Sequence, residues 1–380
     1  MKKRNLTTAT LVLACGLSLT ACSGSGADAT TAAETTASQT TAAETTVAEE
    51  TTTEEAASAT SQEAAEEETE KASEDGAKLR IGQVEGAAHG DKCFTVATAV
   101  IDENDAIVAA VIDEYQFLDS DQTGVPNSDA FIADGSVAEG KVLGSKKVNN
   151  EYYSENMAKA GSTLPIAVNF DQIENFAVGK TSAELKELAG KTPEEVLDAV
   201  SGATLADTAG YLSVIADAAD AAKENPAVSY DGDVTGLALN VVEAAAHGTK
   251  CFTIAAALTD GTNVVLSYID EFQFLDSEQI GVPNSASFTE GGSILDGKVL
   301  GSKRVNNKYY SENMKKAGST VEIAANFDAI QEFVNGKTID ELKELTGKPA
   351  EEVIDGISGA TLADTVGYVT AILAAAELIY

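Results

Sequence analysis

The chain has 380 residues, and its 61 acidic and 25 basic side chains give a formal charge of −36. Because 44% of the residues are hydrophobic, the composition excludes a wholly disordered chain. The acidity argues against nucleic-acid binding and against electrostatic attachment to anionic lipid, since both need clustered lysine and arginine. Four cysteines, two histidines and no tryptophan also argue against a disulfide-rich scaffold or a zinc cluster.

The N-terminal segment has the order of an export signal. Three basic residues precede an apolar run over residues 11–19, which is too short to span a bilayer in the mature protein. Small residues then lead to Cys22, which stands where bacterial lipoproteins carry their lipid-modified cysteine. We therefore expect a signal peptide over residues 1–21 and a chain held at the membrane only by a lipid anchor on Cys22. The alternative is ordinary secretory cleavage with an incidental cysteine.

Residues 22–78 consist mainly of threonine, alanine, glutamate and serine, and they contain no aromatic residue. Fourteen acids against two lysines leave this segment strongly negative. Such a segment buries little apolar surface and repels itself, so we expect a disordered tether between the membrane and the folded part. A glycosylated stalk is another interpretation of the threonine-rich composition.

The rest of the chain is one unit written twice. Residues 140–163 and 297–320 differ at only three of 24 positions. The offset between the copies is 158 residues at the two histidines but 157 residues from Asp113 and Asp270 onward. The copies therefore differ in length by one residue between these points.

Two apolar runs in each copy predict a pair of antiparallel strands. They cover residues 94–101 and 107–117 in the first copy, and residues 252–258 and 264–274 in the second. Turn residues between the runs mark a hairpin tip, where a length difference of one residue is tolerated.

The second part of each copy is expected to be helical. Thr181 and Thr192 are followed three residues later by glutamate, and Pro193 stands at a first helical position. The last segment predicts one buried helical stripe, formed by Leu362, Val366, Val369, Leu373 and Ala376.

Each copy is therefore predicted to be an α+β domain in which an antiparallel sheet is packed with helices. The two domains are expected over residues 79–223 and 237–380. A short polar linker over residues 224–236 joins them. The fold class expected for the chain is two tandem α+β repeats after the tether.

A short motif precedes the last helix of each copy, DAVSGAT over residues 198–204 and DGISGAT over residues 355–361. It predicts a tight turn, in which glycine permits unusual backbone angles and alanine permits close approach. The amides and the dipole at the start of the following helix favour an anion. The alternative is that Ser201 or Thr204 only caps the helix.

This motif resembles the flavinylation motif of the FMN-binding domain family, whose members include flavin-carrying components of the sodium-translocating NADH:quinone reductase and of the Rnf complex. In that family, a magnesium-using FAD:protein FMN transferase joins the FMN phosphate to the hydroxyl of the motif threonine. The resemblance implies that Thr204 and Thr361 each carry one covalent FMN. It implies recognition and turn roles for the other motif positions, which are Asp198, Ser201, Gly202, Ala203, Asp355, Ser358, Gly359 and Ala360.

The whole chain resembles the bis-FMN lipoproteins of flavin-based extracellular electron transfer in Gram-positive bacteria. The lipidation signal, the acidic tether and the two tandem domains carry this resemblance. It implies a carrier on the extracellular face of the cell membrane, which takes electrons from membrane electron-transfer proteins and passes them to extracellular acceptors such as ferric iron. Such a protein is an electron carrier more than an enzyme with its own substrate. A surface lipoprotein that binds a solute or a partner without flavin is the alternative.

Candidate contacts for the flavin ring lie between the hairpin and the helical part. They are aromatic and methionine side chains and two proline loops, namely Tyr152, Tyr153, Met157, Tyr309, Tyr310, Met314, Pro126 and Pro283. Aromatic and methionine residues near a helix start are also typical of a plain core. The adjacent acids at positions 113–114 and 270–271 are the acidic pairs that the sequence offers for a pocket.

The rare polar residues outside the motif have simpler interpretations. His89 and His247 each precede a glycine, where a turn or surface position is usual and a proton-relay role is the alternative. Cys93 and Cys251 open strands, one in each copy, and we expect them to be buried and without an intradomain disulfide.

Overall fold

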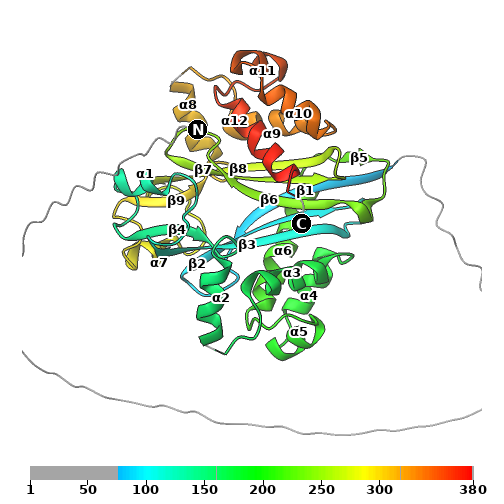
Figure 1. Cartoon of the computed structure of the whole chain (residues 1–380), viewed down its shortest axis with the longest axis vertical. Coiled ribbons are helices and arrows are strands. Elements are labelled where there is room, and N and C mark those ends of the chain that lie inside the picture. Colours follow the sequence, from blue (N-terminus) through cyan, green and yellow to red (C-terminus); the bar gives the residue numbers. More distant parts are fainter. Residues whose placement is uncertain (1–75, 160, 317, 379–380) are drawn as a thin grey trace, which may run out of the picture. The chain divides into compact units, whose positions relative to one another are not determined.

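The computed structural model describes residues 76–378 apart from residues 160 and 317 (Figure 1). The predicted signal peptide, the lipidation at Cys22 and the tether up to residue 75 lie outside the described residues. The described elements occur in the same order twice, and we call the two sets the first half and the second half.

The first half consists of β1 (Ala77–Gly86), β2 (Cys93–Ile101), β3 (Ile107–Asp119), α1 (Ser128–Ala133), β4 (Lys141–Ser145), α2 (Asn150–Lys159), α3 (Ile166–Ala177), α4 (Ser182–Ala189), α5 (Pro193–Ala199) and α6 (Thr208–Lys223). A strand, β5 (Val228–Tyr230), and a short 3-10 turn (Val234–Gly236) follow. The second half consists of β6 (Ala238–Ala244), β7 (Cys251–Thr259), β8 (Val264–Asp276), α7 (Ser285–Glu290), β9 (Lys298–Ser302), α8 (Asn307–Lys316), α9 (Ile323–Val334), α10 (Ile339–Thr346), α11 (Ala350–Gly356) and α12 (Thr365–Ala376).

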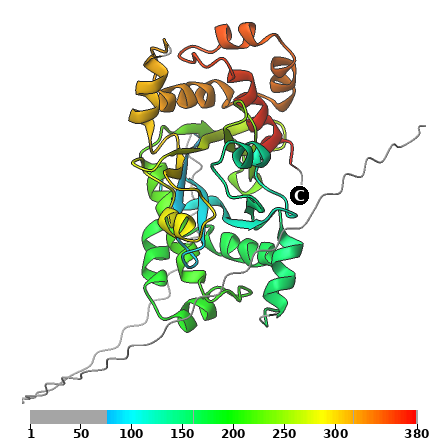
Figure 2. The ribbon, with the colours of Figure 1, turned by 90° about the vertical axis from the view of Figure 1, so that its left-hand side faces the viewer.

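The predicted hairpins are confirmed, and they form the middle of two antiparallel sheets. The strand order is β4-β3-β2-β1-β5 in the first sheet and β6-β7-β8-β9 in the second. Helices α3 to α6 cover the outer face of the first sheet, and α9 to α12 cover that of the second (Figures 1 and 2). The α+β class with antiparallel sheets and covering helices is therefore confirmed.

Five strands differ from the expectation. β1 and β6 extend the sheets beyond the predicted hairpins, and β1 begins at Ala77, two residues before the expected domain boundary. β4 and β9 lie in the part of each copy that the sequence predicts to be helical, so that prediction is wrong there. β5 lies within the expected linker, residues 224–236, and pairs with β1. The linker thus supplies the edge strand of the first sheet.

The two sheets share one aromatic core between their inner faces. The ring centroids of Phe94 and Phe272 lie 6.4 Å apart, and those of Tyr115 and Phe252 lie 6.3 Å apart. All nine residues of β2 are buried, because one face of this strand meets the second half while the other meets α6. Stacked sheets bury their inner faces in this way. The two halves are therefore packed against each other through a shared core.

Two asparagines interlock the halves at the ends of the hairpins. Asn284 Nδ2 donates to the carbonyl oxygens of Gly90, at 3.0 Å, and Cys93, at 2.7 Å. Asn127 makes the two equivalent bonds into the second half, at the same distances. Both asparagines have positive φ, 70° for Asn127 and 66° for Asn284, a conformation that asparagine tolerates better than most residues. Each half thus holds the other by the same contact, as in a symmetric dimer.

The helix signals are confirmed at the starts of α4 and α5. Thr181 and Thr192 each form a capping box with the glutamate three residues later, and Pro193 is the first residue of α5. The stripe predicted for the last helix is confirmed at Val369, Leu373 and Ala376, which are buried on α12. It is wrong at Leu362, since α12 begins only at Thr365, and Val366 is half-buried.

Candidate functional site

The repeated motif forms the same turn in both halves, between α5 and α6 and between α11 and α12. Gly202 has a φ of 96° and Gly359 a φ of 92°, the left-handed region in which other residues are strained. A Cβ at Gly202 would also lie 2.8 Å from the side-chain oxygen of Gln172. Glycine is therefore required by the turn itself.

The turn exposes the two predicted acceptor threonines. Thr204 and Thr361 are both exposed, while Ala203 and Ala360 beneath them are only 8% and 7% exposed. The remaining polar positions of the motif are exposed as well: Asp198, Ser201, Asp355 and Ser358. The polar residues of the motif are thus exposed, while its alanines are buried beneath them.

The capping interpretation of the motif is wrong. The N-cap residue of α6 is Asp207, three residues after Thr204, and that of α12 is Asp364. Neither Ser201 nor Thr204 occupies the cap, so the hydroxyl of Thr204 is not used in that way.

A buried asparagine holds each of the two predicted acceptor threonines. Asn169 on α3 is fully buried, and its Oδ1 accepts from the backbone N–H of Thr204 at 2.7 Å and from Thr204 Oγ1 at 3.0 Å. In the second half, Asn326 on α9 makes the same bonds to Thr361, at 2.6 Å and 3.2 Å. Sequence reasoning missed both asparagines. The available signal was an asparagine kept at the same place in two otherwise apolar helix segments, IAVNF and IAANF.

The two histidines pair with the aspartates at the helix starts. His89 Nδ1 lies 2.6 Å from Asp207 Oδ2, and His247 Nδ1 lies 2.5 Å from Asp364 Oδ2. A Cβ at Gly210, in the first turn of α6, would lie 2.2 Å from the carbonyl oxygen of Ala88. The histidine loop therefore packs directly against the helix that follows the acceptor turn. The expected surface position is confirmed, since the His89 and His247 side chains are 48% and 44% exposed, but the aspartate partners were not foreseen.

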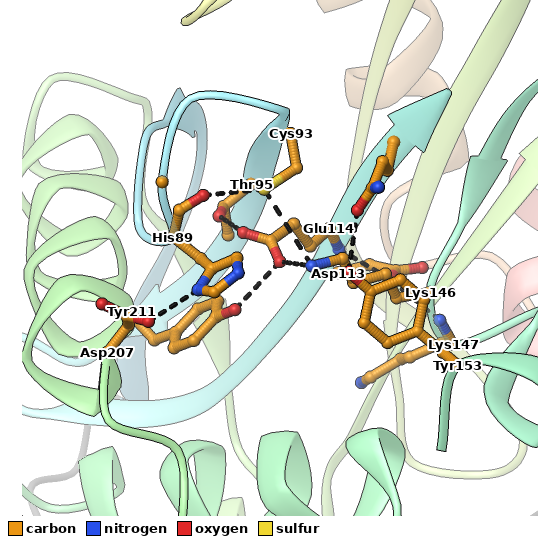
Figure 3. A network of polar contacts seen from close by, with 12 residues as sticks. His89, Cys93, Thr95, Asp113, Glu114, Lys146, Lys147, Tyr153, Asp207 and Tyr211 are labelled. Atoms are coloured by element: carbon orange, nitrogen blue, oxygen red, sulfur yellow. Dashed lines mark hydrogen bonds and ion pairs between the residues drawn. The ribbon is translucent and has the colours of Figure 1, made fainter. Parts of the chain in front are cut away.

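A buried network of polar groups lies behind the histidine loop (Figure 3). Glu114 forms an ion pair with Lys146, and both side chains are almost completely buried. The Tyr211 hydroxyl, from α6, donates to Glu114 Oε2 at 2.9 Å, and Thr95 donates to its Oε1 at 3.1 Å. The Lys146 ammonium lies 4.4 Å from the centre of the Tyr153 ring. This network joins α6, the sheet and α2.

The second half repeats this network with Glu271, Lys303, Tyr368, Thr253 and Tyr310. Cys93 and Cys251 border the two networks, and both are buried free thiols, as expected. Burial, followed by the neighbouring glutamate, raises the pKa of each thiol far above its ordinary value. These thiols therefore stay protonated at neutral pH.

The acidic pairs line neither of the two cavities described below. Glu114 and Glu271 belong to the buried networks. Asp113 accepts a hydrogen bond from Ser145, and Asp270 accepts one from Ser302. Burial raises the pKa of both aspartates above its ordinary value.

A cavity of about 380 Å³ lies between β8 and α8 in the second half, and it includes all three ring-contact candidates of that half. It is lined by Gln273, Phe274, Leu275, Asp276, Lys298, Tyr309, Tyr310, Asn313 and Met314. Tyr310 and Met314 also pack against the same hydrophobic cluster as Ala360 and Leu362 of the acceptor turn. Cavity and turn therefore flank one core.

In the first half, the cavity found beside the candidates is a different one. Tyr152 lines it together with Val148 and Asn149, and its volume is about 370 Å³. Tyr153 and Met157 pack against the core cluster of the first half, as Tyr310 and Met314 do in the second. The Pro126 and Pro283 loops hold the opposite half through Asn127 and Asn284, so contact with the other half is the role that their geometry supports.

Comparison with known proteins gives no match for this chain among protein-family models, curated proteins or solved structures. Within the described residues, no helix is long and apolar enough to cross a membrane. The same residues contain no cluster of three or more side chains suited to hold a metal ion.

Proposed function

We propose that this protein is a membrane-anchored extracellular electron carrier with two FMN groups, joined by phosphoester bonds to Thr204 and Thr361. A lipid on Cys22 anchors it, and an FAD:protein FMN transferase loads it. It takes electrons from membrane electron-transfer proteins and passes them to extracellular acceptors such as ferric iron. The observation that carries this proposal is an exposed threonine, held by a buried asparagine, on the same left-handed glycine turn in each half.

The residues around the acceptor turn fit a covalent flavin. Both threonines are exposed residues, which a second protein can reach, while the turn behind them is fixed by glycine and by the buried alanine. In the second half, the cavity between β8 and α8 offers two tyrosines and Met314 to a flat aromatic ring, and Gln273 and Asn313 to its polar edge. Flavin, when bound, supplies redox chemistry that ordinary side chains lack.

Two helices connect these ring contacts to the acceptor. In the second half, the N–H of Ile323 donates to Ser311 Oγ on α8 at 3.0 Å, and the N–H of Ala324 donates to Asn307 Oδ1 at 3.1 Å. The side chains of α8 thus satisfy the free amides at the start of α9. Because α9 carries Asn326, the helix that bears the tyrosines and the turn that bears Thr361 are joined through one helix. The first half has the same two bonds between α2 and α3.

Intact mass tests the proposal. We expect the full chain, expressed with the transferase and FAD, to gain the mass of two FMN groups that resist denaturation. Thr204→Ala and Thr361→Ala are each expected to remove one group, and the double variant both. Thr163→Ala and Thr320→Ala are matched controls, since each removes the side chain of an exposed threonine outside the motif and is expected to keep both groups.

The outcomes separate the chemistry from the site. A native chain that gains no mass contradicts the carrier function and favours a lipoprotein that binds a solute or partner without flavin. Covalent flavin in the double threonine variant contradicts the assignment of the acceptors and leaves the cofactor standing.

A further inference from the structure

The orientation of the Asn169 side-chain amide is fixed by its four contacts. Oδ1 accepts the backbone N–H of Thr204, and Nδ2 donates to the carbonyl oxygens of Leu164 and Pro165, at 3.4 Å and 3.0 Å. If the amide were flipped, its NH₂ group would face the N–H of Thr204, and its oxygen would face the carbonyl oxygens of Leu164 and Pro165. Only one orientation satisfies this buried group.

That orientation determines what the acceptor hydroxyl does. Because Oδ1 can only accept, Thr204 Oγ1 must donate its hydrogen to Asn169 across the 3.0 Å contact. The hydrogen then points into the protein, and the lone pairs of Oγ1 point away from Asn169. Since Thr204 is exposed, those lone pairs are available to a second protein. Asn326 and Thr361 repeat the arrangement.

We infer that Asn169 and Asn326 are positioning residues for flavin transfer, which hold each threonine oxygen in the place from which it attacks the phosphorus; this inference rests on the proposed function. In the step, Thr204 Oγ1 forms a bond to the FMN phosphorus of FAD, the bond from that phosphorus to the AMP oxygen breaks, and AMP leaves. As this bond forms, the hydroxyl turns its hydrogen from Asn169 Oδ1 to a general base of the transferase, which takes the proton, while the bond from the backbone N–H of Thr204 to Asn169 continues to hold the threonine in place. Fixing a nucleophile before attack lowers the barrier by removing the need to orient it.

The same contact changes once the ester has formed. The ester oxygen has no hydrogen to donate, so it loses its bond to Asn169 Oδ1, while the backbone N–H of Thr204 keeps its own. Asn169 therefore stays partnered in the product, and only the threonine side chain is free to turn. The asparagine orients the reactant hydroxyl and leaves the product unconstrained.

The two halves provide an internal control for the test. In Asn169→Ala, Thr361 remains native in the same molecule, so its loading reports on the transferase, on FAD and on the folding of the second half. We expect the rate of FMN transfer to Thr204 to fall by about 10- to 100-fold, with transfer to Thr361 unchanged. Asn326→Ala is expected to give the opposite pattern. Site-resolved mass spectrometry of peptides over a time course measures both rates.

Two further variants separate positioning from simple stabilisation. Asn240→Ala also removes a buried asparagine that bonds two backbone carbonyls, but these lie at the far end of α12, and we expect loading of Thr361 to be unchanged. Asn169→Asp keeps an acceptor oxygen beside Thr204, and a protonated carboxyl can still donate to Pro165. It is expected to load Thr204 faster than Asn169→Ala. Positioning lowers the maximal transfer rate at saturating transferase, with little change in the transferase concentration that gives half of it.

Equal loading rates at Thr204 and Thr361 in folded Asn169→Ala overturn the inference, and so does Asn169→Asp loading no faster than Asn169→Ala. If Asn169→Ala fails to fold, loading at Thr361 falls too, and the comparison then rests on Asn169→Asp against the native chain. Failure of the proposed function has a different signature, because no variant and no native chain then gains FMN at either site.

Discussion

The two halves share the motif turn, the asparagine that bonds it and the buried ion pair, but they differ beside the third strand of each sheet. In the first half, Glu174 Oε1 accepts from the N–H of Ile112 and from Lys147 Nζ, both at 2.8 Å. In the second half, Gln331 Oε1 accepts from the N–H of Ile269 at 2.9 Å and from Arg304 at 2.6 Å. The pair of Glu174 and Lys147 in the first half thus corresponds to the pair of Gln331 and Arg304 in the second.

The difference shows which part of this contact the fold requires. The acceptor oxygen for the amide of the strand is kept in both halves, while the formal charge of the group that carries it is not. Arg304 finds its counter-charge in Asp328, at 2.8 Å, and also bonds the carbonyl oxygen of Ile269. A planar guanidinium can serve these several partners at once, which an ammonium cannot do in the same geometry.

The largest effect is expected where the halves are identical. Lys146→Met leaves Glu114 charged and buried without its partner, and Lys303→Met does the same to Glu271. We expect each change to lower the free energy of unfolding by about 3–5 kcal/mol, measured by denaturant titration. Lys141→Met breaks an exposed pair with Asp119 and is the control, with an expected cost of less than about 1 kcal/mol.

If the two networks are equivalent, Lys146→Met and Lys303→Met lower the free energy of unfolding by similar amounts. Very different losses would contradict this equivalence. We also expect the halves to unfold as one cooperative unit, because they share an aromatic core and exchange asparagine contacts. Unfolding in two steps would contradict this expectation.

Much of the local structure follows from the sequence, because local signals are short-range. Turn residues between apolar runs are sufficient for the hairpins, and threonine followed by glutamate is sufficient for the starts of α4 and α5. The packing of the two sheets on each other does not follow in the same way. β2 is buried on both faces, so its apolar run carries no alternation that would say what lies on either side.

The site shows the same limit. The motif threonines and the turn can be recognised within seven residues, but His89 and its partner Asp207 are 118 residues apart. Lysine is usually a surface residue, but Lys146 is buried because it forms an ion pair with Glu114 on β3. Such pairs depend on strand register and helix packing, which single-sequence patterns do not specify.

A second comparison concerns two half-buried glutamates at equivalent places in β1 and β6. Burial, with the nearby charge of Asp113, raises the pKa of Glu243 to about 8, and burial with Asp270 raises that of Glu85 to about 8. Tyr115 belongs to the surroundings of Glu243, whereas the equivalent position of the second half is Phe272. The charge of an aspartate in the opposite half thus acts on each glutamate.

A group whose pKa is raised on folding stabilises the protonated native state. This contribution is complete below the ordinary pKa of 4.5 and is lost as the pH rises towards about 8. We expect Glu243→Gln to lose less stability than the native chain between pH 5 and pH 8, by about 1–3 kcal/mol. Denaturant titrations across this range measure the difference. Glu85→Gln is the matched variant, and a native pH slope in both variants would contradict the shifted pKa values.

The smallest effect is expected at the helix before each acceptor turn. α5 has Thr192 as its N-cap, whose side chain accepts from the N–H of Glu195, with Pro193 as first residue. α11 has Pro349 as its N-cap instead, and no capping side chain is found there among the described residues. Thr192→Ala is expected to lower the free energy of unfolding by about 1 kcal/mol. The converse change, Pro349→Thr with Ala350→Pro, gives α11 the start of α5 and is expected to stabilise by about 0.5–1 kcal/mol.

Denaturant titration measures both changes, and hydrogen exchange of the amides in α5 and α11 assigns them to their helices. If the cap accounts for the difference, the amides of native α11 exchange faster than those of α5, and the double change at positions 349 and 350 removes the gap. Equal exchange in the native chain would mean that packing of Val196 and Val353, which are fully buried on the two helices, sets their stability and the cap does not. The different N-caps of α5 and α11 would then have no effect on the stability of the helices that precede the two motif turns.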